Sequence, residues 1–333
     1  MTISKESPRP LVSIVIPTYN RCGDLKRCLD SLLSQTLDDF EITVIDNGST
    51  DGTPDLLKKY PIKVIRDSKK NLPYLFNIGW RTASADIVAY INDDAEAVPD
   101  WLENILKTFD EFKDAEFVGG PTISTRKQEI LATYEMSQRS MLRVFAHVYN
   151  VVVHEGRLLD IGVLSYESGA YSIGASLHMS TKLGHSFYVD NLSLTGMAVK
   201  KKLFYGIGGF DENFQFSQLD GDLIIRARKA GYRLVFNPKA IVYHHISPVG
   251  STRVPFYLGR DFGYFYMKNI RPKSVSGCLR FALNIFFLNS YWLYRAFQLR
   301  SVKPLKGVLA FIFGVIEYLN KSAYKHPPKS KRN

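Results

Sequence analysis

Short apolar runs alternate with amphipathic segments along the first 120 residues of the chain. Apolar runs of roughly four to eight residues, rich in Val and Ile, are typical of strands buried on both faces of a parallel sheet. Apolar residues three or four positions apart predict helices between them. Strands are expected at 11–16, 41–45, 62–66, 86–91 and 116–118, and helices at 24–33, 53–60, 72–82 and from 100 onward. This alternation predicts βαβ units and a mostly parallel sheet with helices on both faces.

The second half of the chain has a less regular pattern. Between residues 122 and 190 we expect partly irregular structure, with a helix near 131–145. Strands are expected at 192–199, 232–236 and 240–243, with a helix at 220–230. Two later apolar runs, 281–294 and 308–319, are shorter than the roughly 20 residues of a membrane-spanning helix. They predict helices that pack on the domain, or that lie in a membrane interface with Arg and Lys at the lipid head groups.

Length and composition allow one large α/β domain with an appendage, or two domains, since the chain has 333 residues of which 45% are hydrophobic. The net charge of +11 suits a phosphate-bearing ligand, an anionic membrane or nucleic acid, although a solvated surface also accounts for it. Three cysteines without a disulfide framework or CxxC spacing favour a reducing compartment. The polar N-terminal residues lack a signal-peptide pattern, so we expect a cytoplasmic protein.

The strand expected at 86–91 ends abruptly at Asn92, Asp93 and Asp94. Open α/β sheets bind ligands at the carboxyl ends of their strands. Two adjacent carboxylates repel each other unless a cation lies between them, and hard oxygen ligands suit Mg²⁺ or Mn²⁺ bridging to a substrate phosphate. The alternative interpretation is an ordinary polar turn before a helix, where Asp and Asn are common anyway.

An ordered set of short motifs extends this signal over about two-thirds of the chain. They lie at 12–20 (VSIVIPTYN), 46–51 (DNGSTD), 77–79 (NIG), 91–94 (INDD), 208–212 (GGFDE), 220–223 (DGDL) and 238–244. In this order and spacing the chain resembles the family 2 glycosyltransferases, which use the GT-A fold and nucleotide-sugar donors. The resemblance implies a Rossmann-like, mostly parallel mixed sheet flanked by helices. It implies a catalytic domain at 1–250, with a nucleotide-sugar half at about 10–120 and an acceptor half at about 121–250. The aromatic and basic composition that follows predicts a helical region with a basic tail at 251–333, which is a candidate for membrane association.

The resemblance assigns donor contacts to the strand ends. The residues expected to bind the donor are Pro17, Thr18, Tyr19, Arg21, Asp46, Asn77, Asn92 and Asp93. Pro17, Thr18 and Tyr19 match the edge that cradles the nucleobase, and Asp46 matches the residue that recognises the base. In the DxD-like motif, Asp93 is placed nearer the ribose.

The metal ligands and the catalytic base are also implied by the resemblance. Asp94 and His244 match the ligands of Mn²⁺ or Mg²⁺, and Asp220 matches the general base that activates an acceptor hydroxyl for inverting attack. Asp220 is also a plausible N-cap, and Asp222 is the alternative base if the register differs. A His at a strand end is otherwise often structural.

Some positions depart from the family pattern. Asn92 stands where Asp is usual, which lowers the charge of the metal site, and Asn47 replaces a common second Asp. Leu219 stands where Glu is common and Phe76 where Arg is common. These departures put the acceptor-side and diphosphate contacts in doubt more than the chemistry.

The function expected from the sequence is therefore a metal-dependent, inverting glycosyltransferase of the EC 2.4 class. Its donor is a nucleoside-diphosphate sugar, with a UDP-sugar expected first, and its acceptor a lipid-linked or polysaccharide glycan met peripherally at the inner face of the cell membrane. The alternatives are a sugar nucleotidyltransferase and a catalytically weak nucleotide-sugar-binding member of the family. A nucleic-acid-binding protein is disfavoured, because carboxylates cluster at the strand ends instead of a basic stripe interleaved with aromatic residues.

Overall fold

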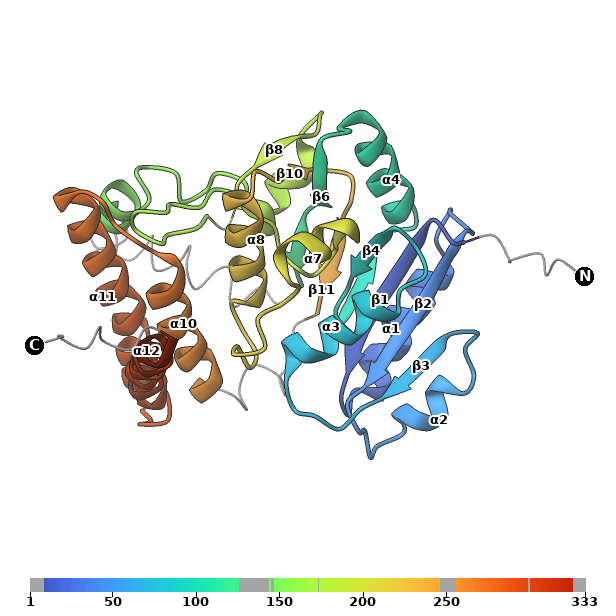
Figure 1. The fold of residues 1–333 in the computed structure, drawn as a ribbon, viewed down its shortest axis with the longest axis horizontal. Helices are drawn as coiled ribbons and strands as arrows, with labels where there is room; N and C mark the ends of the chain where they lie inside the picture. The colour runs from blue at the N-terminus through green and yellow to red at the C-terminus, as the bar shows by residue number, and fades with distance from the viewer. Residues whose placement is uncertain are drawn as a thin grey trace, which may run out of the picture.

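The structure is a computed structural model that describes residues 9–125, 144, 147–172, 174–245, 255–298 and 300–325. The helix expected near 131–145 falls almost entirely outside these residues. Helices cover both faces of a large sheet, and the last three helices form the end of the molecule opposite to β2, β3 and α2 (Figure 1).

Eight strands form one mixed sheet in the order β3-β2-β1-β4-β9-β6-β10-β8. They are β1 (Val12–Thr18), β2 (Phe40–Asp46), β3 (Lys63–Arg66), β4 (Ile87–Tyr90), β6 (Ala115–Gly119), β8 (Phe187–Val189), β9 (Met197–Lys200) and β10 (Arg233–Phe236). The first four strands in the chain are parallel, β9 is antiparallel to β4 and β6, β10 is parallel to β6, and β8 is antiparallel to β10. The expected mostly parallel sheet is confirmed. The strand expected at 192–199 was placed too early, because only Met197–Lys200 pairs with its neighbours.

The helices follow the apolar periodicity of the sequence. They are α1 (Cys22–Leu33), α2 (Thr53–Leu57), α3 (Leu72–Thr82), α4 (Trp101–Glu111), α7 (Lys202–Ile207), α8 (Leu219–Lys229), α10 (Pro255–Asn269), α11 (Val275–Gln298) and α12 (Leu305–Lys325). In β1, Ile14 and Ile16 belong to a core that includes residues of α1 and α4, whereas Val15 belongs to the core that includes α3 and α8. The sheet is therefore buried on both faces, as its Val- and Ile-rich strands predict.

A second, three-stranded sheet, which the sequence pattern does not predict, lies at the carboxyl edge. Its order is β5 (Ala95–Ala97), β11 (Val242–His244) and β7 (Thr122–Ser124). β5 begins directly after Asp94, and Ala95 is paired with His244. This register holds the end of β11 beside the polar residues that terminate β4.

The C-terminal helices pack closely on the sheet domain. Tyr264, Phe265 and Tyr266 of α10 share one buried core with Leu223 of α8 and Val88 of β4. The expected boundary at residue 250 stays a prediction, and these contacts cross it. α11 and α12 contain 24 and 21 residues, yet no helix in the described part of the chain carries an apolar stretch sufficient to cross a bilayer.

Gly79 permits the contact between α3 and β1. A Cβ atom at Gly79 would lie 2.2 Å from Val15 Cγ1. We expect Gly79→Ala to lower the free energy of unfolding by about 1–3 kcal/mol, because the added methyl overpacks the core. Urea denaturation measures this. The double variant Gly79→Ala with Val15→Ala should lose less free energy of unfolding than the two single variants lose together, by at least about 0.5 kcal/mol. Strict additivity would contradict the proposed contact.

Candidate functional site

The carboxyl ends of three adjacent strands bring polar side chains together, as the sequence predicts. Thr18, the last residue of β1, is in register with Asp46, the last residue of β2. On the other side of β1, Thr18 Oγ1 donates a 2.7 Å hydrogen bond to Asp93 Oδ2, directly after β4. The candidate site is this edge of the sheet.

A protein cation neutralises the two adjacent carboxylates. Arg21 Nη1 lies 2.9 Å from Asp93 Oδ1 and 2.7 Å from Asp94 Oδ2. Each aspartate is 5% exposed, so both charges are largely removed from water. Burial raises the pKa of Asp93 to about 6, Arg21 opposes this rise, and the charge of Asp94 adds to it. The sequence predicts that a cation lies between these carboxylates, and among the side chains that the structure describes Arg21 contacts both of them.

His244 completes this cluster from the second sheet. Its Nε2 atom lies 3.0 Å from Asp94 Oδ1, and the backbone N–H of His245 donates a 2.8 Å hydrogen bond to the Asp94 carbonyl. The side chain of His245 lies elsewhere, with Nε2 2.7 Å from Glu96 Oε1. The two histidine side chains therefore contact different carboxylates.

Asp46 is 2% exposed and shapes the loop after β2. Its Oδ1 atom accepts a 2.9 Å hydrogen bond from Ser49 N–H, and its Oδ2 atom lies 3.6 Å from Arg66 Nε. Its role in base recognition stays a prediction.

Three other residues that are expected to bind the sugar donor lie at this edge. Tyr19 is 45% exposed, and Lys70 Nζ lies 3.4 Å from the centre of its ring. An exposed aromatic ring next to a cation suits stacking against a base. Asn92 is half-buried, and Pro17 is buried within β1. The donor roles of these residues also stay predictions.

A contact with the sugar donor is expected for Asn77, and in the structure its side chain forms hydrogen bonds within the protein. Its Nδ2 donates to Phe210 O and Glu212 Oε1, and its Oδ1 accepts from Phe210 N–H and Trp80 Nε1–H, all at 2.9–3.0 Å. Asn77 is 1% exposed. We therefore interpret it as the residue that joins α3 to the GGFDE segment at 208–212.

Asp220 lies in the first turn of α8, half-buried. Its carboxylate accepts hydrogen bonds from Gly221 N–H at 2.9 Å and Leu194 N–H at 3.4 Å. Burial raises the pKa of Asp220, and these two backbone donors oppose the rise. In the described part of the chain no Lys or Arg forms an ion pair with this carboxylate. Two residues after Leu194, the backbone N–H of Gly196 donates a hydrogen bond to the carbonyl of Tyr90, the last residue of β4.

Asp222, the alternative base, is occupied by structural contacts. It is fully buried and lies 2.9 Å from Arg226 Nε, 2.6 Å from Lys268 Nζ and 3.0 Å from Asn269 Nδ2. An ion-paired carboxylate with this many donors is a poor proton acceptor. The geometry favours Asp220 over Asp222.

The sequence analysis missed Asp261, which anchors the segment before Asp220. Asp261 is fully buried in α10, and its Oδ2 atom accepts hydrogen bonds from the backbone N–H groups of 215, 216 and 217 at 3.1, 2.7 and 2.9 Å. Arg260 Nη1 lies 2.7 Å from its Oδ1 atom. Gln218 then adopts a left-handed φ of 59° before α8 begins. An acidic residue on a late helix gives no local sequence signal for this role.

The side chains at the edge fit part of a divalent metal site. Asp94 and His244 offer an oxygen and a nitrogen donor, as Mn²⁺ accepts, and Mg²⁺ is often held by one or two carboxylates plus substrate phosphates. Within the described ranges no three His, Cys, Asp or Glu side chains group as metal ligands. The arrangement therefore suits an ion that a bound diphosphate helps to ligate.

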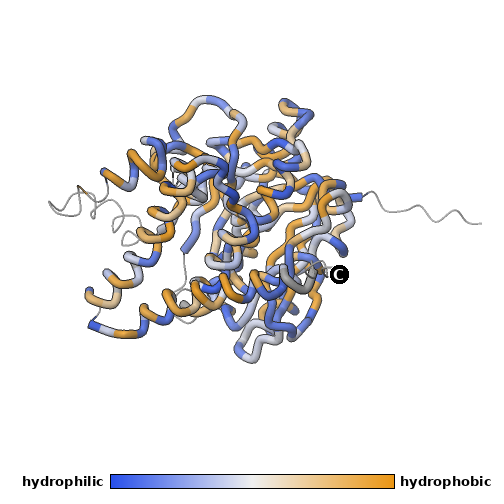
Figure 2. Tube along the Cα trace, turned by 60° about the vertical axis from the view of Figure 1, so that its left-hand side comes forward, coloured by the Kyte–Doolittle hydropathy of each residue, from blue (hydrophilic) through white to orange (hydrophobic). Residues whose placement is uncertain are grey.

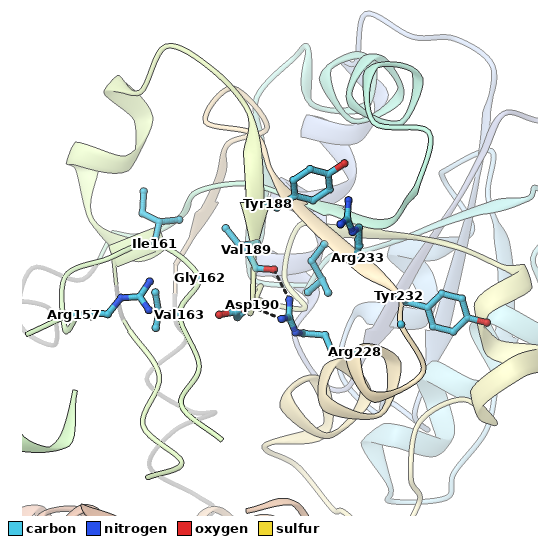
Figure 3. A pocket seen from close by; sticks show the side chains of 12 residues that line it. Arg157, Ile161, Gly162, Val163, Tyr188, Val189, Asp190, Arg228, Tyr232 and Arg233 are labelled. Carbon is cyan, nitrogen blue, oxygen red and sulfur yellow. Dashed lines mark hydrogen bonds and ion pairs between the residues drawn. The ribbon is translucent and has the colours of Figure 1, made fainter. Parts of the chain in front are cut away.

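A cavity of about 430 Å³ lies at the other end of α8 (Figure 3). Its lining includes Arg157, Tyr188, Asp190, Arg228 and Arg233. Arg228 Nη2 lies 2.6 Å from Asp190, and Arg233 Nη1 lies 2.7 Å from Asp114. Because Asp220 is in the first turn and Arg228 in the last turn of α8, this cavity is separate from the candidate site.

Comparison with known proteins identifies a family resemblance in the first half of the chain. The sequence model described as "Glycosyl transferase family 2" matches residues 13–157, which include β1, β2 and β4 with the polar residues at their ends. This part of the chain is similar to glycosyl transferase family 2.

One of the relatives matches over most of its own length as well as most of this chain. The glucosyl-dolichyl phosphate glucuronosyltransferase of Haloferax volcanii is 24% identical over 279 residues, covering 78% of this chain and 76% of the relative. The chain spans only 25%, 40% and 17% of the lengths of the first three curated relatives that it matches.

Solved structures establish the GT-A fold. The mannosyltransferase PcManGT of Pyrobaculum calidifontis, in complex with GDP-Man and Mn²⁺, has a TM-score of 0.57 at 16% identity and covers 93% of this chain and 88% of its own. TarS 1–349 of S. aureus, in complex with UDP-GlcNAc, has a TM-score of 0.53 at 16% identity and covers 91% and 81%. The GT-A fold implied by the sequence resemblance is confirmed.

The anchor at Asp261 is testable through stability and local exchange. We expect Asp261→Asn to lower the free energy of unfolding by about 2–4 kcal/mol, because a buried, ion-paired acceptor loses its charge. Urea denaturation measures this, and the exposed Asp55→Asn is the control. Hydrogen exchange of the amides of 215–217 should accelerate. Unchanged exchange there would show that Asp261 does not hold this segment.

Proposed function

We propose that this chain is an inverting glycosyltransferase that moves a sugar from a nucleoside-diphosphate donor to an acceptor hydroxyl. The observation that carries the proposal is the grouping of Thr18, Arg21, Asp93, Asp94 and His244 at one edge of a GT-A sheet. The similarity to glycosyl transferase family 2 supports the glycosyltransferase class, and the donors of the two solved structures support a nucleotide sugar.

The donor is proposed to lie along the carboxyl ends of β2, β1 and β4. The base contacts Pro17, Thr18, Tyr19 and Asp46, and the ribose lies near Asp93. Asn92 and the guanidinium of Arg21 face the diphosphate. We infer a UDP-sugar first, with GDP-sugars as the nearest alternative because one structural neighbour holds GDP-Man.

Asp94 and His244 are the residues proposed to hold Mn²⁺ or Mg²⁺. A bound ion would supply electrostatic stabilisation of the leaving diphosphate. Arg21 provides a second, fixed positive charge beside the same carboxylates, and a preorganised cation stabilises charge that develops in the transition state. Chelation therefore tests how much of this stabilisation the metal provides.

Asp220 is proposed as the general base. Its carboxylate takes the proton from the acceptor hydroxyl while that oxygen bonds to the anomeric carbon. The bond from this carbon to the phosphate oxygen breaks on the opposite face, the nucleoside diphosphate leaves with the electron pair, and the anomeric configuration inverts. The raised pKa of Asp220 and its lack of a cationic partner among the described side chains support this role.

The acceptor is proposed to be a lipid-linked or polysaccharide glycan met at the inner face of the cell membrane. The similarity to the Haloferax relative, a glucosyl-dolichyl phosphate glucuronosyltransferase, supports a lipid-linked acceptor. The catalytic domain is proposed to be residues 1–250, with α10 bracing the base segment from the C-terminal region.

Donor hydrolysis tests the proposal without the acceptor. We expect one nucleotide sugar from a panel to release nucleoside diphosphate slowly, and more slowly after chelation of Mn²⁺ and Mg²⁺. Asp220→Asn should lower the rate by about 10²–10⁴-fold, since it removes a general base, while donor binding is retained. Asp94→Ala should lose the metal response, and Asp55→Asn is the matched control. Absence of nucleotide-sugar binding under every metal condition would contradict the transferase assignment.

The pH dependence follows from Asp220. A general base acts when deprotonated, and burial raises the pKa of this carboxyl, so activity should fall on acidification at a pH above the ordinary Asp value of about 3.9. A profile of kcat/KM against pH measures this acid limb. Asp220→Asn should abolish the limb along with most of the rate. A limb that persists unchanged in the residual activity of Asp220→Asn would assign it to another group.

A further inference from the structure

The positive charge of the chain is concentrated in the last part of its sequence. Residues 255–333 contain 14 Lys and Arg but only two Asp and Glu. The whole chain contains 43 and 32, so the first 254 residues have 29 basic and 30 acidic side chains and are almost neutral. Within the described helices and the turns between them, 255–325, 11 of the basic residues and both acidic residues occur.

The helix α12 is apolar on two opposite faces. Its inner face packs against α10 so closely that a Cβ atom at Gly314 would lie 1.9 Å from Arg260 O, and one at Gly263 would lie 2.1 Å from Phe311 O. Glu317 of α12 is also bonded to Arg260, with Oε1 2.6 Å from Nη2. These contacts fix which side of α12 faces outward.

The outer face of α12 carries a stripe of large apolar side chains. This apolar stripe consists of Leu309, Ile312, Phe313, Ile316 and Leu319, which are 67%, 51%, 51%, 50% and 49% exposed. Their spacing of three and four residues places them on one side of the helix. A helix that is apolar all round requires a second apolar environment besides the domain it packs on. Figure 2 shows hydrophobic colouring along α12 at the outside of the molecule.

Basic side chains lie at the start of the same stripe. The basic corner between α11 and α12 consists of Arg300, Lys303 and Lys306, all exposed. In the part of the chain that the structure describes, none of the three forms an ion pair. Lys306 precedes Leu309 and Phe313 by three and seven residues, so it lies on the side of the stripe. Phe297 and Val302, 84% and 75% exposed, flank the corner.

We propose that the apolar stripe and the basic corner dock this chain on an anionic lipid bilayer. Helices that lie in a membrane interface bury an apolar face among the acyl chains, while Lys and Arg reach the lipid phosphates. The charge of the C-terminal helices complements such a surface, and a neutral apolar partner would not require it. The inference deepens the proposed function, on which it rests for the lipid-linked acceptor. α12 is joined through α10 and Asp261 to the segment before Asp220, so docking places the bilayer beside the acceptor half.

Co-sedimentation of the full chain with vesicles tests the docking surface. We expect binding to vesicles that contain phosphatidylglycerol, weaker binding to phosphatidylcholine alone, and a loss of binding as salt rises. Ile312→Glu with Ile316→Glu, and separately Lys303→Glu with Lys306→Glu, should each weaken binding by at least about 10-fold.

Matched controls separate the stripe from general surface changes. Leu33→Glu with Val64→Glu changes apolar residues of α1 and β3 that are 47% and 43% exposed, and Lys58→Glu with Lys113→Glu reverses two exposed charges outside the C-terminal helices. Both controls should bind vesicles like the unchanged chain. Thermal melting verifies that every variant is folded.

Three results would overturn the inference. They are absence of binding to anionic vesicles, equal binding by the stripe variant, and conversion of a dimer to a monomer by the stripe variant in sedimentation velocity. Donor hydrolysis is measured in solution on the same samples. Retained hydrolysis with no vesicle binding refutes docking and leaves the proposed transferase function intact. Absence of hydrolysis with retained vesicle binding contradicts the transferase function and leaves the docking surface intact.

Discussion

Two adjacent carboxylates at the end of a buried strand impose the constraint around which the site is arranged. Asp93 and Asp94 are nearly inaccessible to water, and burial together with the neighbouring like charge raises the pKa of Asp93. Cations and hydrogen-bond donors around the two carboxylates oppose this rise. Arg21 from the start of α1, Thr18 from β1 and His244 from β11 supply these partners. Three separate segments of the chain are thereby fixed at one edge of the sheet.

A second buried charge couples the last helices to the same region. Asp261 holds three successive backbone N–H groups ahead of α8, and Lys268 bridges Asp222 of α8 and Asp211 at 2.6 Å each. α10 thus contributes polar anchors as well as apolar packing to the part of the fold that presents Asp220. The C-terminal helices therefore brace α8 and the segment that precedes it.

Local sequence signals predict what depends on local structure. α3 has the bounds expected for it, because Asn71 accepts a hydrogen bond at its N-terminus, Pro73 lies in its first turn and its apolar residues follow a helical period. β1, β2 and β4 are likewise found where Val- and Ile-rich runs place them, and Thr18, Asp93, Asp94 and His244 meet as the family pattern implies.

Long-range contacts explain what the sequence does not reveal. β5 and β7 have three residues each, so their pairing depends on β11 and leaves no periodic signal. Arg21 contacts carboxylates 72 and 73 positions away, and Asp261 contacts amides 44 to 46 positions away. Asn77 matched a donor-site motif, yet its burial between α3 and the GGFDE segment gives it protein partners instead.

The most direct test of the central claim is a crystal structure of the chain soaked with UDP and Mn²⁺, with the manganese located by its anomalous signal. We expect the ion beside Asp94 and His244, and the nucleotide along Thr18, Tyr19 and Asp46. Manganese located away from these residues, or a nucleotide in the arginine-lined cavity at the far end of α8, would contradict it.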